Sequence, residues 1–368
     1  MNLSNEDKKW IDNIWGKLLA KLENNAITLQ NIIPYSTSDN VYLDKAKTDV
    51  GWWTNGFFGG MMWLMYHETK QECFKDAAIK QEEILDGVFD NYNRFDHDIG
   101  FMWGLTSKAN YIQTGNLKSR SRTLYAANIL AARANIRANF IRAWNGIKEY
   151  SIIDCMMNLP ILYWASQELN DNRFSYIAQM HADMALKEHI RDDGSVVHIC
   201  VHDEQTPQIV RTDAGQGYAV GSAWSRGQAW AIYGFLLSYL YTGDEKYLEG
   251  SKKTADYFLD KIKISNYKTV TDFVAPLEVG YFDNSAGACA ACGLIELYKI
   301  TKNNEYIEGA IKILKAMEED CIFDNSNQSI VQKCMVSYSV GEHTDLIYAD
   351  FFLCEAILKL RGSDYLIW

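Results

Sequence analysis

The sequence predicts an all-α fold, an (α/α)6 barrel in which six helical hairpins form an inner and an outer ring. The chain of 368 residues contains only four prolines, which favours long uninterrupted helices. An apolar helix, a polar turn and an amphipathic helix also follow one another repeatedly. Such repeats are typical of helical arrays and closed helical toroids. The turns end at or near Phe74, Leu117, Phe174, Tyr247 and Tyr306.

The two helices of each unit differ in their apolar pattern. The segments before the turns, such as QAWAIYGFLLSYL over 228–240, are apolar on nearly every side, which predicts helices buried all round. The segments after the turns are amphipathic, and over 247–262 the apolar side chains recur with a period near 3.6. Buried helices that alternate with amphipathic ones predict an inner ring surrounded by an outer ring.

Six such units fit the length of the chain. A chain of this length would ordinarily suggest about two domains, but the repetition favours one, so we expect residues 1–368 to form a single barrel domain. A helix over 348–361 closes the predicted ring. The first helices of the six units are expected to begin near Lys9, Gly60, Gly104, Ser151, Trp224 and Ser285.

Residues 190–223 break this rhythm. The segment 195–201 alternates as a strand does, and glycine, proline and aspartate punctuate the rest. Long non-helical insertions in a compact domain are usually functional. We therefore expect a small β-hairpin over the mouth of the barrel, next to the site.

Composition and charge exclude several classes of protein. The formal net charge of −11 argues against nucleic-acid binding. No apolar run approaches the roughly 20 residues that span a bilayer, and the polar start MNLSNEDKKW has no apolar stretch of a secretory signal. The eight cysteines are interpreted as reduced core thiols. We expect a cytoplasmic protein that binds neither nucleic acid nor membrane; its oligomeric state stays open.

Two aspartates stand out as candidate catalytic residues. Asp154 lies within the apolar run IIDCMM, where an ionised carboxylate is costly unless it has a function. Burial and a nearby second carboxylate would both raise its pKa, which suits a general acid. Asp98 and Asp96 flank His97 close to a predicted helix start. A solvated loop with an N-cap aspartate is the alternative interpretation there.

Aromatic residues gather near the predicted starts of inner helices. Trp52 and Trp53 lie beside glycines, and Arg226 lies between Trp224 and Trp230. An arginine among tryptophans can bind a carboxylate while the rings stack on a sugar. A structural aromatic cluster with a salt-bridged arginine explains the same pattern.

The sequence predicts neither a metal nor a cofactor. His198 and His202 could suggest a metal pair, but no third ligand follows at a telling spacing. The glycine-rich motifs of dinucleotide and phosphate-binding loops and the GxSxG motif of serine hydrolases are absent from the sequence.

Seven segments in order resemble the unsaturated glucuronyl hydrolases, glycoside hydrolase family 88, from about residue 51 to residue 361. The family has an (α/α)6 barrel and acts on oligosaccharides that polysaccharide lyases have cut, which carry a C4=C5 double bond on the terminal uronic acid. The resemblance rests on WTNGFFGGMMWL, DHDIGFMW, IRAWNG, IIDCMMNLPILYWA, HICVHD with the following GQG, SAWSRGQAWAIYGF and DNSAGACAACGL.

The resemblance implies a role for each matching residue. Asp154 would be the general acid/base that hydrates the double bond, and Asp98 its partner carboxylate, which would keep Asp154 protonated by like-charge repulsion. Uronic-acid contacts would come from His198, Gln216 and Arg226, and aromatic walls from Trp53, Trp144, Trp224 and Trp230. The implied partner is an unsaturated disaccharide or oligosaccharide of the chondroitin, hyaluronan or heparin type.

One segment departs from the family's pattern. The family tends toward a Trp-Gly-Asp-Tyr-Tyr run, where this chain has Tyr-Ala-Asp-Phe-Phe over 348–352. Some members carry serine and lysine before this run that meet a sulfate, but here neither lysine nor arginine occurs between Lys333 and Lys359. This difference argues against sulfate recognition through that loop. Two alternatives remain: the same chemistry on unsaturated rhamnogalacturonyl or ulvan-type oligosaccharides, and a non-catalytic sugar-binding protein.

Overall fold

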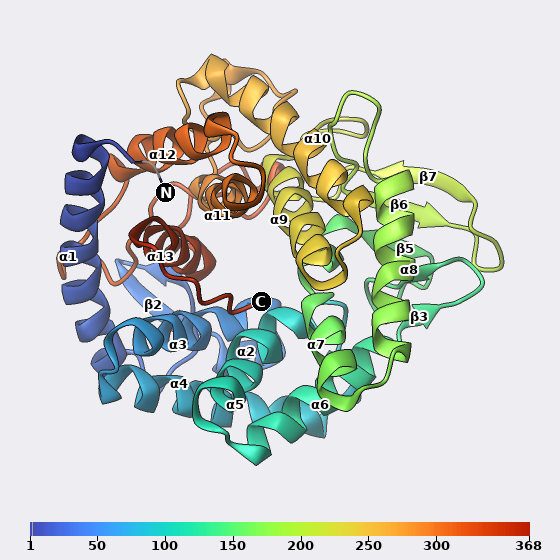
Figure 1. Cartoon of the computed structure of the whole chain (residues 1–368), viewed down its shortest axis with the longest axis horizontal. Helices are drawn as coiled ribbons and strands as arrows, with labels where there is room; N and C mark the ends of the chain where they lie inside the picture. Colours follow the sequence, from blue (N-terminus) through green and yellow to red (C-terminus); the bar gives the residue numbers. More distant parts are fainter. Residues whose placement is uncertain (2) are drawn as a thin grey trace.

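The computed structural model describes residue 1 and residues 3–368, and it confirms the predicted (α/α)6 barrel (Figure 1). Within the described residues the inner ring consists of α3 (Phe57–Thr69), the π-helical segment Gly100–Lys108 with α5 (Ala109–Thr114), α7 (Pro160–Leu169), α9 (Ser225–Thr242), α11 (Asn284–Thr301) and α13 (Ile347–Arg361). The outer ring consists of α1 (Asn5–Thr28), α4 (Glu72–Leu85), α6 (Leu117–Ala131), α8 (Arg173–Glu188), α10 (Glu245–Ile262) and α12 (Asn304–Glu318).

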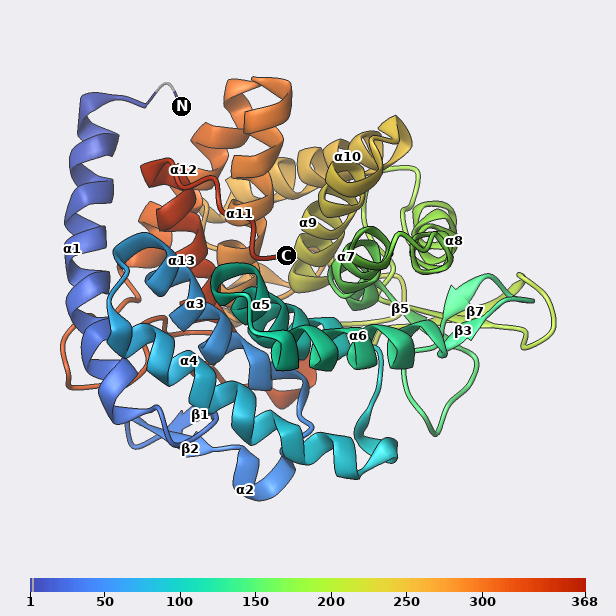
Figure 2. The same ribbon diagram turned by 60° about the horizontal axis from the view of Figure 1, so that its bottom comes forward.

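The first helix differs from the prediction, because it belongs to the outer ring. Figures 1 and 2 show α1 along the outside of the barrel, next to α13. Only one stripe of α1 is buried, including Ile11, Leu18 and Leu22, and such a helix needs a neighbour on one side only. The first and last helices therefore form the sixth hairpin together, and the Arg361 guanidinium lies 4.6 Å above the Trp15 ring.

The fourth inner helix also begins later than predicted. Ser151 lies in strand β5 (Tyr150–Ile152), which is followed by the 3-10 segment Ile153–Met157, and α7 begins only at Pro160. Proline suits the first helical position because it has no N–H and its φ is already helical. The apolar run around Asp154 therefore forms an irregular buried segment ahead of the helix.

The predicted β-hairpin is present and gains a third strand. Strands β6 (Ile199–His202) and β7 (Ile209–Asp213) pair antiparallel, and β5 adds to β6 with Ser151 opposite Cys200. Figure 1 shows this sheet at the edge of the barrel beside α8. Four short elements complete two further antiparallel pairs, β1 (Pro34–Ser38) with β2 (Val41–Asp44) and β3 (Ala134–Asn135) with β4 (Phe140–Ile141), and α2 (Ala46–Asp49) follows β2.

A close backbone approach joins the two segments that carry the candidate aspartates. Gly100 lies two residues after Asp98, and a Cβ atom on it would lie 2.6 Å from Asn158 Cα and 2.7 Å from the Asn158 carbonyl oxygen. Neither of these backbone atoms can move without displacing the 3-10 segment that precedes α7. Glycine at position 100 therefore sets how close Asp98 and Asp154 lie.

None of the helices in the described part of the chain combines the length and the apolar character needed to cross a membrane.

Gly100→Ala is expected to lower the free energy of unfolding by about 1–3 kcal/mol, the usual cost of overpacking. Gly104→Ala is the matched control in the same segment, because a Cβ there has no neighbour within 4 Å. It is expected to be neutral or stabilising. Urea unfolding of both variants checks this, and equal stabilities would contradict the importance of the close approach.

Candidate active site

The two aspartates open onto a single cavity of about 370 Å³. Polar and aromatic side chains converge there, as expected for a small-molecule site. Arg94, paired with Asp49, is partly exposed on its wall, whereas His97 and Arg226 are almost fully buried. The lining residues are Asp49, Gly51, Trp52, Trp53, Arg94, Asp96, His97, Asp98, Trp144, Ile152, Asp154, Gln216 and Arg226.

Asn158 links the two aspartates. Its side-chain Nδ2 donates to Asp98 Oδ1 at 3.2 Å and to the Asp154 backbone carbonyl at 3.3 Å. Its Oδ1 accepts from the Phe101 N–H at 2.7 Å, which attaches it to the first turn of the π-helical segment. One buried amide thus fixes the segment of Asp98 relative to that of Asp154.

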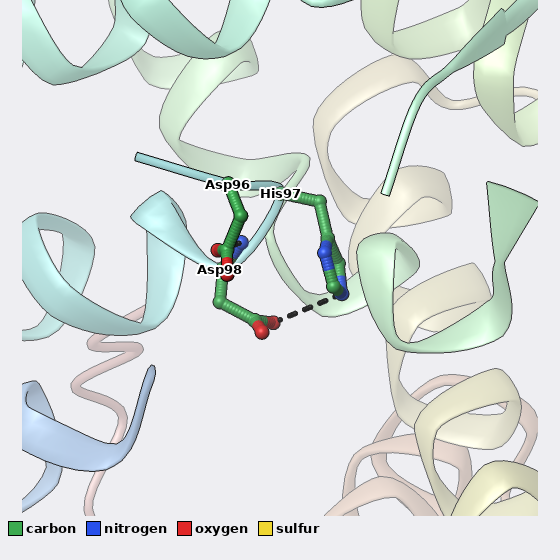
Figure 3. A group of neighbouring side chains, drawn as sticks. All are labelled: Asp96, His97 and Asp98. Carbon is green, nitrogen blue, oxygen red and sulfur yellow. Dashed lines mark hydrogen bonds and ion pairs between the residues drawn. The ribbon is translucent and has the colours of Figure 1, made fainter. Parts of the chain in front are cut away.

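The geometry around His97 indicates that Asp98 carries a proton. His97 Nδ1 lies 3.0 Å from the Ala143 carbonyl, which only accepts, so Nδ1 is protonated. In the neutral ring Nε2 is then an acceptor, and it faces Asp98 Oδ1 at 3.2 Å (Figure 3). Two acceptors at this distance need a proton between them. Burial, helped by the charges of Asp96 and Asp154, raises the pKa of Asp98 well above its ordinary value.

The sequence run Asp96–Asp98 contains the candidate cation ligands. Asp96, His97 and Asp98 each offer one ligand atom, and these atoms lie within 4.8 Å of one another (Figure 3). Carboxylate and imidazole groups suit a divalent cation by donor type. A proton shared between His97 and Asp98 already explains their contact, so the expectation that the chain needs no metal stays a prediction.

Asp154 differs from its prediction, because its pKa is lowered. Burial alone would raise this pKa. His198, His97 and Arg226 together lower it by more than burial raises it, so the net shift is downward. His198 Nε2 lies 3.4 Å from Asp154 Oδ2. The sequence suggested burial and a second carboxylate around Asp154, whereas the groups that lower its pKa reach it from the segment before β6, from α9 and from the segment before the π-helix. The two carboxyl groups thus have opposite pKa shifts: Asp98 holds a proton, which faces His97, and Asp154 is ionised.

Arg226 is a buried cation with one donor left unused. Its Nη1 donates to the Asp283 carboxylate and, at 2.6 Å, to the Met335 carbonyl, and its Nη2 donates to the Val336 carbonyl at 2.7 Å. Nε is buried and has no hydrogen-bond partner within the described residues. Because Arg226 also lines the cavity, its positive charge can attract an anionic ligand there.

The structure brings together most of the residues predicted for the site. Trp53, Trp144 and Gln216 line the cavity with Arg226 and both aspartates, and His198 adjoins it through Asp154. Trp224 and Trp230 are not among the lining residues. The Trp224 ring lies 4.2 Å from that of His198, and the buried Trp230 packs 6.5 Å from Trp53. We therefore interpret both as supports behind the cavity wall.

Sequence reasoning missed several residues of the site. His97 was noted only as the neighbour of two aspartates, although its position inside the pair was a usable signal. Asn158 lies in the same motif as Asp154, four residues on, where a buried amide could have been suspected. The ion pair of Arg94 with Asp49 joins residues 45 positions apart and leaves no local signal.

Comparisons with known proteins agree with the fold. No family model matches the chain. It is 32% identical over 90% of its length to an unsaturated glucuronyl hydrolase of Bacillus sp. (strain GL1), covering 92% of that protein. It is 31% identical over 96% of its length to an unsaturated chondroitin disaccharide hydrolase of Streptococcus pneumoniae, covering 92%.

A solved structure shows the same architecture. The crystal structure of the Bacillus sp. GL1 unsaturated glucuronyl hydrolase, described as responsible for the degradation of glycosaminoglycan, superposes with a TM-score of 0.87. The match covers 95% of this chain and 96% of that one at 29% identity.

Asn158→Ala is expected to raise the pKa of Asp98 further, because the Asn158 amide stabilises the ionised carboxylate. Loss of the amide should also lower the free energy of unfolding by about 1–3 kcal/mol. The ¹³C chemical shift of the Asp98 carboxyl, followed with pH, measures the first effect.

Asn110→Ala is the matched control, since Asn110 is a buried amide that donates to Glu82 at 2.6 Å. It should cost similar stability and leave the titration of Asp98 unchanged. An unchanged Asp98 pKa in Asn158→Ala would contradict the role of this hydrogen bond.

Proposed function

We propose a reaction for this chain on the premise that it belongs to the unsaturated glucuronyl hydrolase family, and is therefore a glycoside hydrolase. Its substrate is a glycosaminoglycan oligosaccharide already cut by a lyase, of the chondroitin, hyaluronan or heparin type. The enzyme releases the 4,5-unsaturated uronic acid from the non-reducing end. The names of the two relatives, one of which acts on an unsaturated chondroitin disaccharide, support this substrate class.

The observation that carries the proposal is the pair of carboxyl groups with opposite pKa shifts, next to a cation with a free donor. Asp98 keeps its proton and Asp154 is ionised while Arg226 and His198 face it. The free Nε–H of Arg226 suits the carboxylate of a uronic acid. A cavity of about 370 Å³ leaves room for the sugar to which it belongs.

Binding of the uronate prepares Asp154 as the acid. The substrate carboxylate offsets the positive charge of Arg226, which otherwise helps to lower the pKa of Asp154. The pKa of Asp154 then rises, and the proton held by Asp98 moves to Asp154. Asp98, now ionised, accepts hydrogen bonds from the sugar hydroxyls.

The chemical steps then use Asp154 alone as acid and base. Asp154 gives its proton to C4 of the vinyl ether, and positive charge develops on C5 and the ring oxygen. A water molecule adds to C5 and returns a proton to Asp154. The hemiketal opens to a ketone, and the ring oxygen becomes a hydroxyl on C1. The hemiacetal at C1 collapses to an aldehyde and releases the leaving sugar. Because C5 is attacked, the usual relation between carboxylate spacing and stereochemistry does not apply.

The walls of the cavity set the position of the sugar. The rings of Trp53 and Trp144 offer apolar faces for stacking, and Gln216 offers an amide for a hydroxyl group. Gln216 is itself held by the segment that binds Arg226, since its Nε2 donates to the Val336 carbonyl at 3.0 Å.

The loop after Val336 bears on the choice of leaving sugar. It carries Glu342 and Asp345 but neither lysine nor arginine. A sulfate on the leaving sugar would find no lysine or arginine in this loop, so we propose a preference for unsulfated disaccharides.

We also propose a cytoplasmic location. All eight cysteines are free thiols, which suits a reducing compartment.

The wild-type enzyme is expected to remove the ultraviolet absorbance of the C4=C5 bond when mixed with unsulfated chondroitin or hyaluronan disaccharide, and more slowly with sulfated forms. Asp154→Asn should slow this decay by about 10²–10⁴-fold or more, the usual range for loss of an acid–base group.

Asp256→Asn, on the outer helix α10, is the matched control and should keep full activity. Unchanged decay in Asp154→Asn would overturn the mechanism. Decay only with pectin-lyase or ulvan-lyase products would assign the alternative substrates. Binding without any decay would indicate a sugar-binding protein.

Asp98→Asn is expected to abolish activity and to stabilise the fold at neutral and alkaline pH. The folded state raises the pKa of Asp98 from 3.8, so its contribution to stability is present at low pH and is lost as the pH rises through the folded pKa. An asparagine amide replaces the protonated carboxyl as donor to His97 without that loss. Thermal unfolding at pH 5 and pH 9 checks this, and a variant less stable than wild type at pH 9 would contradict it.

A further inference from the structure

A second buried polar cluster lies behind the catalytic residues, and the proposed reaction does not use it. It consists of Ser151 on β5, His202 on β6 and His189, the residue that follows α8. All three are at most 1% exposed. Ser151 Oγ lies 3.0 Å from His189 Nε2 and 2.7 Å from His202 Nε2.

The partners of these groups define where every proton lies. His189 Nδ1 lies 2.8 Å from the Val197 carbonyl, so it carries a proton and Nε2 of the neutral ring is an acceptor. Of the acceptors near the Ser151 hydroxyl, His189 Nε2 at 3.0 Å is much closer than the weak acceptor Met184 Sδ at 3.9 Å, so Ser151 donates its single hydrogen to His189. Ser151 therefore accepts from His202, whose Nε2 carries the proton. The hydrogen bonds run in one direction, from His202 through Ser151 and His189 to the Val197 carbonyl.

This chain of hydrogen bonds passes through the segments that carry Asp154 and His198. Ser151 precedes Asp154 by three residues, and Val197 is the neighbour of His198. His189 contacts Val197 twice, since its carbonyl also accepts from the Val197 N–H at 2.7 Å. The Ile153 N–H donates to the His198 carbonyl at 3.1 Å, which joins the segments of Asp154 and His198 directly.

We propose that Ser151, His189 and His202 are positioning residues that set the distance between Asp154 and His198 through this one-directional chain of hydrogen bonds. The proposal rests on the proposed function only in the roles of Asp154 and His198. The separation of these two groups decides how far His198 lowers the pKa of Asp154. Loss of these hydrogen bonds would therefore change proton transfer more than substrate binding, because Trp53 and Arg226, which are proposed to bind the substrate, belong to other elements.

These hydrogen bonds also require neutral histidines, so they affect the stability of the fold in acid. Burial lowers the pKa of His189 to about 4 and that of His202 to about 4. The groups that face them are His181 and Glu188 from α8, His198 from the segment before β6, and Asp154. Since the unfolded histidines bind protons more readily, their contribution to stability is present above pH 6.5 and is lost as the pH falls toward 4.

The first test needs no activity. In the ¹⁵N spectrum of the wild-type protein with labelled histidine, His189 is expected as the Nδ1–H tautomer and His202 as the Nε2–H tautomer at pH 7. The reverse tautomers, or a charged ring, would overturn the proposed direction.

The second test compares three variants in the absorbance assay. His202→Leu and Ser151→Ala each interrupt the chain, so kcat should fall at least 10-fold with less than 2-fold change in KM, and the acid limb of the kcat profile should shift. His202→Gln keeps an N–H for Ser151 and should recover most of kcat. His202→Gln should also take up about one proton fewer than the wild-type protein on unfolding near pH 5.5, because it lacks one titrating histidine.

Ser251→Ala is the matched control, because Ser251 is an equally buried serine whose hydroxyl donates to the Ile232 carbonyl at 2.7 Å, between α9 and α10. It should lower stability and leave kcat and its pH profile unchanged. If Ser151→Ala and Ser251→Ala behave alike, or if His202→Gln is no better than His202→Leu, the positioning role is refuted. Such results leave the proposed function intact, since that depends on Asp154→Asn and on the wild-type assay.

Discussion

The cost of burying charge is the constraint on which this site depends. An ionised group that is removed from water must be paired or neutralised. Arg226 is paired with the buried Asp283 and with two backbone carbonyls, while burial beside other carboxylates keeps a proton on Asp98. Asp154 is the one that stays ionised, because His198, His97 and Arg226 face it. The cavity thereby holds a carboxylic acid and a carboxylate at the same pH.

The barrel makes this arrangement possible by bringing the starts of inner helices together at one end. Asp98 precedes the π-helical segment, Asp154 precedes α7, Arg226 lies in the first turn of α9, and Asp283 caps α11. The inner helices are apolar and buried all round, so polar side chains can gather only at their ends. The positive ends of the helix dipoles also favour the carboxylates there. Parallel inner helices therefore place the polar and titratable side chains together at one end of the barrel.

Much of this was predictable from local pattern. The alternation of wholly apolar and amphipathic segments predicted the two rings, because the period of a helix and its burial are local properties. The apolar surroundings of Asp154 and the grouping of Trp224, Arg226 and Trp230 drew attention to the correct segments. The prediction was wrong where the structure of a segment depends on a partner far away in the sequence. Helix α1 packs against α13 rather than opening a hairpin with α3, and Ser151 lies in a strand because it pairs with β6.

The order of apolar and polar residues along the chain was enough to predict the helical barrel, the break at 190–223 and the candidate pair Asp98 and Asp154. Three features emerged only in three dimensions: which carboxyl group holds the proton, the place of Trp224 and Trp230 behind the cavity wall, and the link that Asn158 makes between the two aspartates. These features depend on distances between residues far apart in sequence, and on the electrostatic field of groups that converge from several elements. Neither these distances nor this field can be obtained from a local sequence pattern.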